Sequence, residues 1–248
     1  MTSNDRVILD KVFEQQRSEI APALSASAYF EIFTAEQVLK DYDLSYPEIE
    51  SGIVGNGGDG GIDSIYTFVN GELLREDSDL SFLKKNIDIE LYLIQSKASA
   101  TFSEEVLHKL TAVTNDLLNL SHLLEDYSTV YNEDLLRQIK LFRDNFVLFA
   151  SRFPSLQLNY IYASHGESIH PNVDRKVKIL ENATKSLFTS SKFQFQFLGS
   201  KELLALARRS PKTTYSLTLA ENPICSECEV GFICLVSLRD YYQFITDE

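Results

Sequence analysis

The hydrophobic positions along the chain follow helical and strand spacings in turn, and this alternation predicts an α/β fold. Between Asp5 and about Asp41 apolar residues recur at helical spacing, and Pro22 is expected to separate two helices there. Further along, the pattern predicts strands at 64–74, 89–99, 156–164 and 192–199 and helices at 101–120, 133–153, 173–188 and 200–209. Strands and helices in this order form a mixed sheet with helices on both faces.

Local signals add detail to these elements. Asn70-Gly71 is a strong hairpin-turn dipeptide between two alternating runs. Ser103 is a suitable N-cap for the helix that follows the second strand. In that strand, 89–99, apolar residues stand on both sides of the backbone, so we expect burial on both faces of the sheet for Leu91, Leu93 and Ile94.

Two prolines mark boundaries in the pattern. The helix at 133–153 is expected to continue to Pro154, which cannot extend it. Past Pro211 the pattern changes to strands joined by a turn with Pro and Cys, and then to the start of a helix. We therefore expect one large domain at 1–210 and, at 211–248, a β-hairpin extension and the start of a following domain, so that the chain is part of a longer protein.

The three cysteines lie in this last region. Cys225 and Cys228 have the spacing of half a zinc site, but the second pair of ligands is missing, so neither a zinc site nor a disulfide framework is expected. Cys234 belongs to an apolar run that predicts a buried strand, where a free cysteine behaves as a small apolar residue.

Composition and charge narrow the classes of function. The 248 residues are 44% hydrophobic, which suits one large domain with a sizeable core, and they carry a net charge of −13. A protein that binds long nucleic acid over its whole surface is expected to be basic, so any such contact must be local or depend on metal ions or on another part of a larger protein. The start has no signal-peptide pattern, and no stretch reaches the ~20 apolar residues of a bilayer span, so a cytoplasmic protein without membrane contact is expected.

The stretch "GIVGNGGDGGID", residues 52–63, holds six of the ten glycines and ends in Asp63. A P-loop is excluded because no lysine follows the glycines, and a dinucleotide-binding turn needs a strand before them and a helix after them, which is the reverse of the order here. A surface turn favoured by Asp59 and Asp63 remains open. So does a loop in which glycine lets the backbone approach a ligand closely.

The strand "LIQSK" favours the second interpretation, a loop whose backbone approaches a ligand closely. Gln95 and Lys97 are two residues apart and therefore point to the same face of the sheet. If this strand is a neighbour of the strand that Asp63 opens, all three side chains can converge at one edge. The alternative for Lys97 is a simple salt bridge at the end of a strand.

These motifs carry a resemblance to a known family. "GDGGID", the strand-borne "QSK" and an upstream "FEIFTAEQVL" resemble the Mrr-type branch of the PD-(D/E)xK nuclease superfamily. More narrowly, residues 25–110 resemble the N-terminal nuclease-like region of abortive-infection phage-resistance (AIPR) proteins, which usually continue into a further large domain. The resemblance implies a restriction-endonuclease-like fold, with a mixed central sheet flanked by helices on both faces, and catalytic roles for Asp63, Gln95, Lys97 and a helix acid, Glu31 or, failing that, Glu36.

The resemblance also implies chemistry. Hydrolysis of a phosphodiester is expected to use Mg²⁺, for which Mn²⁺ can substitute, with Asp63 as the main ligand, Glu31 as a second acid, the Gln95 amide oxygen and, by resemblance, the backbone carbonyl of Ser96. Lys97 would orient the water or stabilise negative charge, and Asp59 would support the loop.

Three functional hypotheses follow. The first is a metal-dependent endonuclease in anti-phage abortive-infection defence, with DNA favoured over RNA as the substrate. The second is a non-catalytic or autoinhibited module of the same fold that binds nucleic acid or a partner protein and depends on the C-terminal region of a longer chain. The third is an oligomerising scaffold, such as a homodimer, built on the two long helices between Ser103 and Arg152.

Overall fold

The computed structural model describes residues 4–166, 168–211, 217–221, 224–225 and 232–246. The chain divides into two compact units, Met1–Ser210 and Pro211–Glu248. The strands of the first unit are β1 (Ser64–Val69), β2 (Glu72–Leu73), β3 (Asp88–Lys97), β4 (Ser155–Ser164) and β5 (Lys192–Leu198). Its helices are α1 (Asn4–Ile20), α2 (Ala26–Val38), α3 (Tyr46–Ser51), α4 (Glu104–Leu117), α5 (Glu133–Leu148), α6 (Pro171–Leu187) and α7 (Ser200–Arg208).

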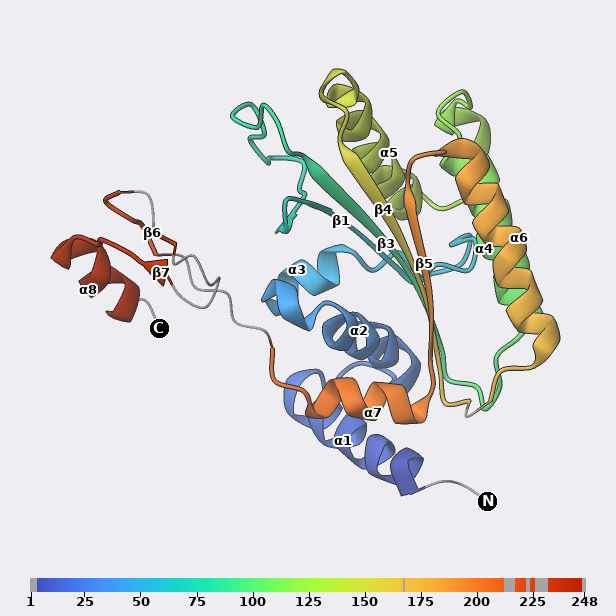
Figure 1. The fold of residues 1–248 in the computed structure, drawn as a ribbon. Coiled ribbons are helices and arrows are strands. Elements are labelled where there is room, and N and C mark those ends of the chain that lie inside the picture. The colour runs from blue at the N-terminus through green and yellow to red at the C-terminus, as the bar shows by residue number, and fades with distance from the viewer. Residues whose placement is uncertain (1–3, 167, 212–216, 222–223, 226–231, 247–248) are drawn as a thin grey trace. The chain divides into compact units, whose positions relative to one another are not determined.

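The five strands form one mixed sheet in the order β2-β1-β3-β4-β5. β1 runs antiparallel to β2 and β3, whereas β3, β4 and β5 run parallel to one another. Helices α1, α2, α3 and α7 lie on one side of the sheet, and α4, α5 and α6 lie on the other (Figure 1). The predicted α/β architecture, a mixed sheet with helices on both faces, is confirmed.

Each face of the sheet has its own core, and β3 contributes to both. Leu91 and Leu93 pack into the cluster shared with α4, α5 and α6, while Ile94 packs into the cluster shared with α1, α2 and α7. All three side chains are fully buried. The expectation that this strand is buried on both faces is therefore confirmed, and its long apolar run is explained by its place in the middle of the sheet.

Several local expectations are confirmed as well. The Ser103 hydroxyl accepts a hydrogen bond from the Glu105 amide and caps α4. Asn70 and Gly71 form the β1–β2 turn with φ values of 52° and 86°, the left-handed pair that a tight hairpin requires. The first two helices are separate, as Pro22 suggested.

Two helical features differ from the expectation. The helix predicted to run to Pro154 ends at Leu148, and a short 3₁₀ turn, Ala150–Arg152, follows it. The chain must turn there to start β4, where the Ser155 amide donates to the Ile87 carbonyl on the neighbouring strand. Helix α3 was not predicted, since its six residues are too few to show a hydrophobic period, although Ser45 and Glu48 form a capping box.

The second unit contains a two-stranded antiparallel pair, β6 (Ile224–Cys225) and β7 (Phe232–Ile233), and helix α8 (Leu238–Thr246). The prediction of a buried Cys234 is wrong, because this residue follows β7 and is exposed. Strands of two residues build too little sheet to bury it. Cys228 lies outside the described residues. Among the helices that the structure describes, none combines the length and the apolar character needed to cross a bilayer.

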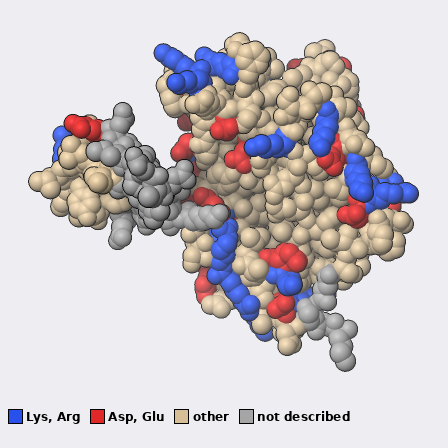
Figure 2. All heavy atoms as spheres, viewed as in Figure 1, with Lys and Arg blue, Asp and Glu red and all other residues tan. Residues whose placement is uncertain are grey.

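Charged side chains of both signs are mixed on the surface. On the face shown in Figure 2, small groups of Lys and Arg alternate with Asp and Glu instead of merging into one basic field. Together with the net charge of −13, this distribution means that the face shown does not present a broad basic surface.

Candidate functional site

The pairing of β1 with β3 brings the predicted site residues together. Ser64 is opposite Ile94 in the antiparallel register, so the next pair outward is Asp63 and Gln95. The Asp63 amide also donates to the Ile94 carbonyl at 2.9 Å. The condition set from the sequence, that these two strands are neighbours, is confirmed, and Lys97 lies two residues beyond Gln95 on the same strand.

The Asp63 carboxylate is buried and held by β3. One of its oxygens, Oδ2, accepts a hydrogen bond from the Gln95 side-chain amide at 2.6 Å and another from the Ser96 backbone amide at 2.6 Å. Only 7% of the residue is exposed. Its orientation is therefore set by the strand next to it, and Oδ1 is the oxygen that these two bonds leave available.

Glu31, on α2, reaches the same place beside Gly55. A Cβ atom built on Gly55 would lie 2.9 Å from Glu31 Oε2 and 3.6 Å from Asp63 Oδ1. The absence of a side chain at this position is what allows both carboxylates to approach one point.

Glu36, the alternative helix acid, points elsewhere. Five residues along an α-helix correspond to a rotation of about 140° relative to Glu31, so the two acids cannot face the same site. Glu36 instead raises the pKa values of Tyr29, Tyr46 and Tyr66, after the larger effect of burial on each. The structure thus brings Glu31 to Asp63 and leaves Glu36 among tyrosines.

The two site carboxyls hold their protons unusually tightly. Burial raises the pKa of Asp63 to about 8, with smaller upward effects from Glu31 and Asp59, while the Ser96 amide and Lys97 pull it down. Burial, and then the charge of Asp59, raises the pKa of Glu31 to about 7. Carboxyls placed so that they repel one another and lack water are common at functional sites and are stabilised by a bound cation.

The stretch 52–63, which we call the glycine loop, is held in place by Asn132, the N-cap residue of α5. The Asn132 side-chain amide donates to the carbonyls of Val54 and Gly57, while its backbone amide donates to Gly58. Gly60 has φ +60°, and a Cβ there would lie 2.2 Å from Val113 of α4, so only glycine fits. The loop is therefore a docked structure and not a free surface turn.

Asp59 supports this loop from within. Its Oδ1 accepts a hydrogen bond from the Gly61 amide at 2.7 Å, which is the geometry of an Asx turn. Its carboxyl also borders the site cavity. Asp59 therefore contributes charge to the site as well as holding the loop.

A cavity of about 180 Å³ opens beside these residues, and we call it the site cavity. It is lined by Asp59, Gly61, Asp63, Gln95, Lys97, Glu105, Val106 and Lys109. Lys97 is exposed and makes no ion pair with any acid that the structure describes, so the strand-end salt bridge left open by the sequence is not formed. Glu105 and Lys109 were not predicted. The feature of the sequence that could have identified them is their position, four residues apart on the helix that directly follows "QSK".

The oxygen atoms around Asp63 suit a hard cation. Mg²⁺ takes one or two carboxylates with neutral oxygens and keeps several waters. Asp63, Glu31 and the Gln95 amide oxygen are such donors, and the oxygens of Glu31 and Asp63 both border the space beside Gly55. Among the described residues, no three His, Cys, Asp or Glu side chains are grouped so as to hold a metal by themselves, so water and neutral oxygens would complete the ligand set.

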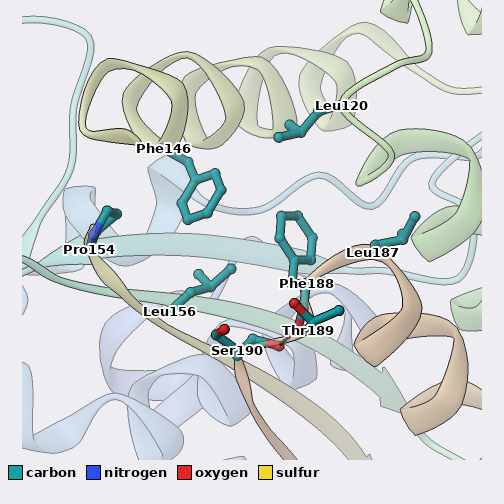
Figure 3. A pocket seen from close by; sticks show the side chains of 9 residues that line it. Leu120, Phe146, Pro154, Leu156, Leu187, Phe188, Thr189 and Ser190 are labelled. Carbon is teal, nitrogen blue, oxygen red and sulfur yellow. Dashed lines mark hydrogen bonds between the residues drawn. The ribbon is translucent and has the colours of Figure 1, made fainter. Parts of the chain in front are cut away.

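A second cavity, the apolar groove, differs in chemistry. It measures about 280 Å³ and is lined by Leu120, Phe146, Pro154, Leu156, Leu187, Phe188, Thr189, Ser190 and Ser191. The rings of Phe146 and Phe188 face this space from α5 and from the turn after α6 (Figure 3), with centroids 5.4 Å apart. No charged side chain lines it, so it offers packing but no acid or base.

No family model matches the chain, and searches of curated proteins and of solved structures likewise returned no match.

Proposed function

We propose that the unit Met1–Ser210 is a metal-dependent nuclease with a restriction-endonuclease-like arrangement of its mixed sheet. Its substrate would be nucleic acid, with DNA favoured over RNA, and its role would be anti-phage abortive-infection defence. The choice of DNA and the role in defence rest on the resemblance to Mrr-type and AIPR proteins. The observation that carries the chemical proposal is the convergence of Asp63, Gln95 and Lys97 at one cavity, where two strands and the glycine loop meet.

Each residue has a task under this proposal. Asp63, Glu31, the Gln95 amide oxygen and the Ser96 carbonyl would hold Mg²⁺, which when bound neutralises charge on the phosphate and activates water. Gln95 already orients Asp63 through its amide N–H. Lys97, with its ammonium group free at the rim of the cavity, would position the attacking water or stabilise the negative charge that develops on phosphorus.

A second candidate, a non-catalytic or autoinhibited module of the same fold, is favoured by a specific observation. Gln95 is neutral, and the described residues contain no ready group of three acidic or His/Cys ligands. Such a site would bind a cation weakly on its own. Activity would then depend on a partner protein or on a further part of a longer chain.

The test is cleavage of plasmid, single-stranded DNA and RNA with Mg²⁺ or Mn²⁺. Asp63→Ala and Lys97→Ala should each lower the rate by at least about 100-fold, because they remove the main ligand and, of the two lysines that line the cavity, the one without an ion pair to a described acid. Lys185→Ala, which changes an exposed lysine of α6 outside the cavity, should leave the rate unchanged.

Equal activity in the wild type and in both site variants would falsify the nuclease proposal. Inertness of the wild type with every metal and substrate, together with binding of nucleic acid, would favour the second candidate. The comparison of DNA with RNA in the same assay decides the substrate preference.

A further inference from the structure

Lys109 occupies a position at the site that the proposed reaction does not yet use. It lies on α4, and its stem covers the glycine loop, because a Cβ built on Gly61 would lie 3.0 Å from Lys109 Cβ and 3.2 Å from its Cδ. The same residue borders the site cavity together with Asp63, Gln95 and Lys97. Its cation is therefore carried to the cavity by a packed stem on a helix and not by a loose loop.

The Lys109 ammonium group is engaged by one acid of its own helix. Its Nζ lies 3.1 Å from Glu105 Oε1, and the side chains of Lys109 and Glu105 are 54% and 65% exposed. A solvent-exposed pair of this kind adds little to stability, so it separates readily when a stronger partner arrives. After separation, Glu105 remains hydrated and suffers no burial.

The charge of Lys97, the second lysine of the cavity, also acts on Glu105. The hydrogen bond from Lys109 lowers the pKa of Glu105, with a further effect from the charge of Lys97. Lys97, Lys109 and this one carboxylate border the same cavity. A phosphate is also an anion with several acceptor oxygens, and it can take the place of the carboxylate as the partner of Lys109.

We propose that Lys109 binds a backbone phosphate of the nucleic acid beside the scissile one, and that Glu105 occupies this phosphate position until the substrate enters. The inference rests on the proposed function, since it names how the same site grips its substrate. It explains how a chain with net charge −13 can hold a polyanion locally: the lysines meet the phosphates while an exchangeable carboxylate neutralises one of them at rest.

The experiment measures binding separately from cleavage. Fluorescence anisotropy of a labelled DNA duplex and of a labelled single strand, with EDTA and at several salt concentrations, gives the affinity and its salt dependence. Lys109→Ala should weaken binding by about three- to tenfold and reduce the slope of log K against log salt by about one phosphate contact. Lys109→Arg should restore the slope.

Glu105 supplies the complementary test. Glu105→Gln should strengthen binding, because the competing carboxylate is gone, and this gain should vanish in the double variant Glu105→Gln/Lys109→Ala. The pair Glu181 and Lys185 on α6 has the same four-residue spacing, and the Lys185 side chain is exposed to a similar extent as that of Lys109, but the pair does not border the cavity. Lys185→Ala and Glu181→Gln therefore serve as matched controls and should change neither affinity nor slope. Thermal unfolding of each variant confirms that it is folded.

The outcomes separate this inference from the proposed function. If the wild type binds and cleaves but Lys109→Ala matches Lys185→Ala in slope, the role of Lys109 is wrong and the nuclease stands. If a gain from Glu105→Gln persists without Lys109, the exchange between carboxylate and phosphate is wrong. If the wild type neither binds nor cleaves any nucleic acid, both the inference and the proposed function fail.

Discussion

The site cavity and the apolar groove are both cavities of the unit Met1–Ser210, and they differ in whether burying their lining side chains is favourable. The groove is the larger, about 280 Å³ against about 180 Å³. Its walls are core side chains such as Leu156 and Phe188, whose burial is favourable. The smaller cavity keeps Asp63 buried with its pKa raised to about 8, which is unfavourable for the ionised form. The two cavities therefore differ in the cost of their linings: the apolar groove is built from favourable burial, whereas the site cavity holds a carboxyl whose ionised form is unfavourable.

The largest expected effect tests whether the groove is only structural. Phe188 is 7% exposed and packs edge-on against Phe146. Phe188→Ala should lower the free energy of unfolding by about 3 kcal/mol, as for other buried phenylalanines, when measured by chemical denaturation. Cleavage per folded molecule should stay at the wild-type rate. A folded variant that has lost cleavage would show that the groove and the site cavity are coupled.

The second effect, a fall in stability with rising pH, tests whether the ionised form of Asp63 is unfavourable in the site cavity. Because the folded-state pKa of Asp63 is raised above its ordinary value, the protonated carboxyl stabilises the fold, and this contribution is lost as pH rises toward about 8. The metal-free protein should therefore lose on the order of 2 kcal/mol between pH 6 and pH 8. Thermal or chemical unfolding across this range measures the change.

Asp63→Asn is the control for that pH dependence. It keeps the size of the side chain but cannot ionise, so most of the fall in stability with pH should disappear. In the wild type, Mg²⁺ added at pH 8 should recover part of the lost stability, since a cation favours the ionised carboxyls. A fall that is unchanged in Asp63→Asn would assign it to other groups.

The smallest expected effect, on the cleavage rate, distinguishes Glu31 from Glu36, the two acids of α2. Glu31→Gln should slow cleavage by about tenfold, roughly 1.4 kcal/mol of barrier, because Glu31 is the second acid beside Asp63. Glu36→Gln should leave the rate unchanged, although burial raises the pKa of this residue to about 6 as well. The same plasmid assay compares the two. A larger loss with Glu36→Gln would reverse the assignment that the helix geometry makes.

Local features were readable from the sequence because each depends on a few adjacent residues. Ser103 caps its helix, and Asn70-Gly71 turns its hairpin, wherever they stand. The spacing of Glu31 and Glu36 on a helix was enough to predict that the two acids face different directions. The predicted convergence of Asp63 with Gln95 required one further fact, that β1 lies beside β3, which local pattern leaves conditional.

The features that could not be predicted depend on contacts between distant segments. The end of α5 at Leu148 is set by where β4 must begin. The exposure of Cys234 depends on how few residues β6 and β7 pair. Lys109 becomes a site residue only because α4 packs over the glycine loop, and nothing within its own helix distinguishes it from Lys185.

The clamp formed by Asn132 has a consequence for how the site assembles. Its side chain holds the carbonyl of Gly57 across a separation of 75 residues. Closing so long a loop is slow compared with forming a helix or a hairpin, and it cannot precede the synthesis of the residues that close it. On the ribosome, Glu31 and Asp63 would both emerge well before Asn132, so the nascent chain carries both of these acids before it has the residue that clamps the glycine loop beside them.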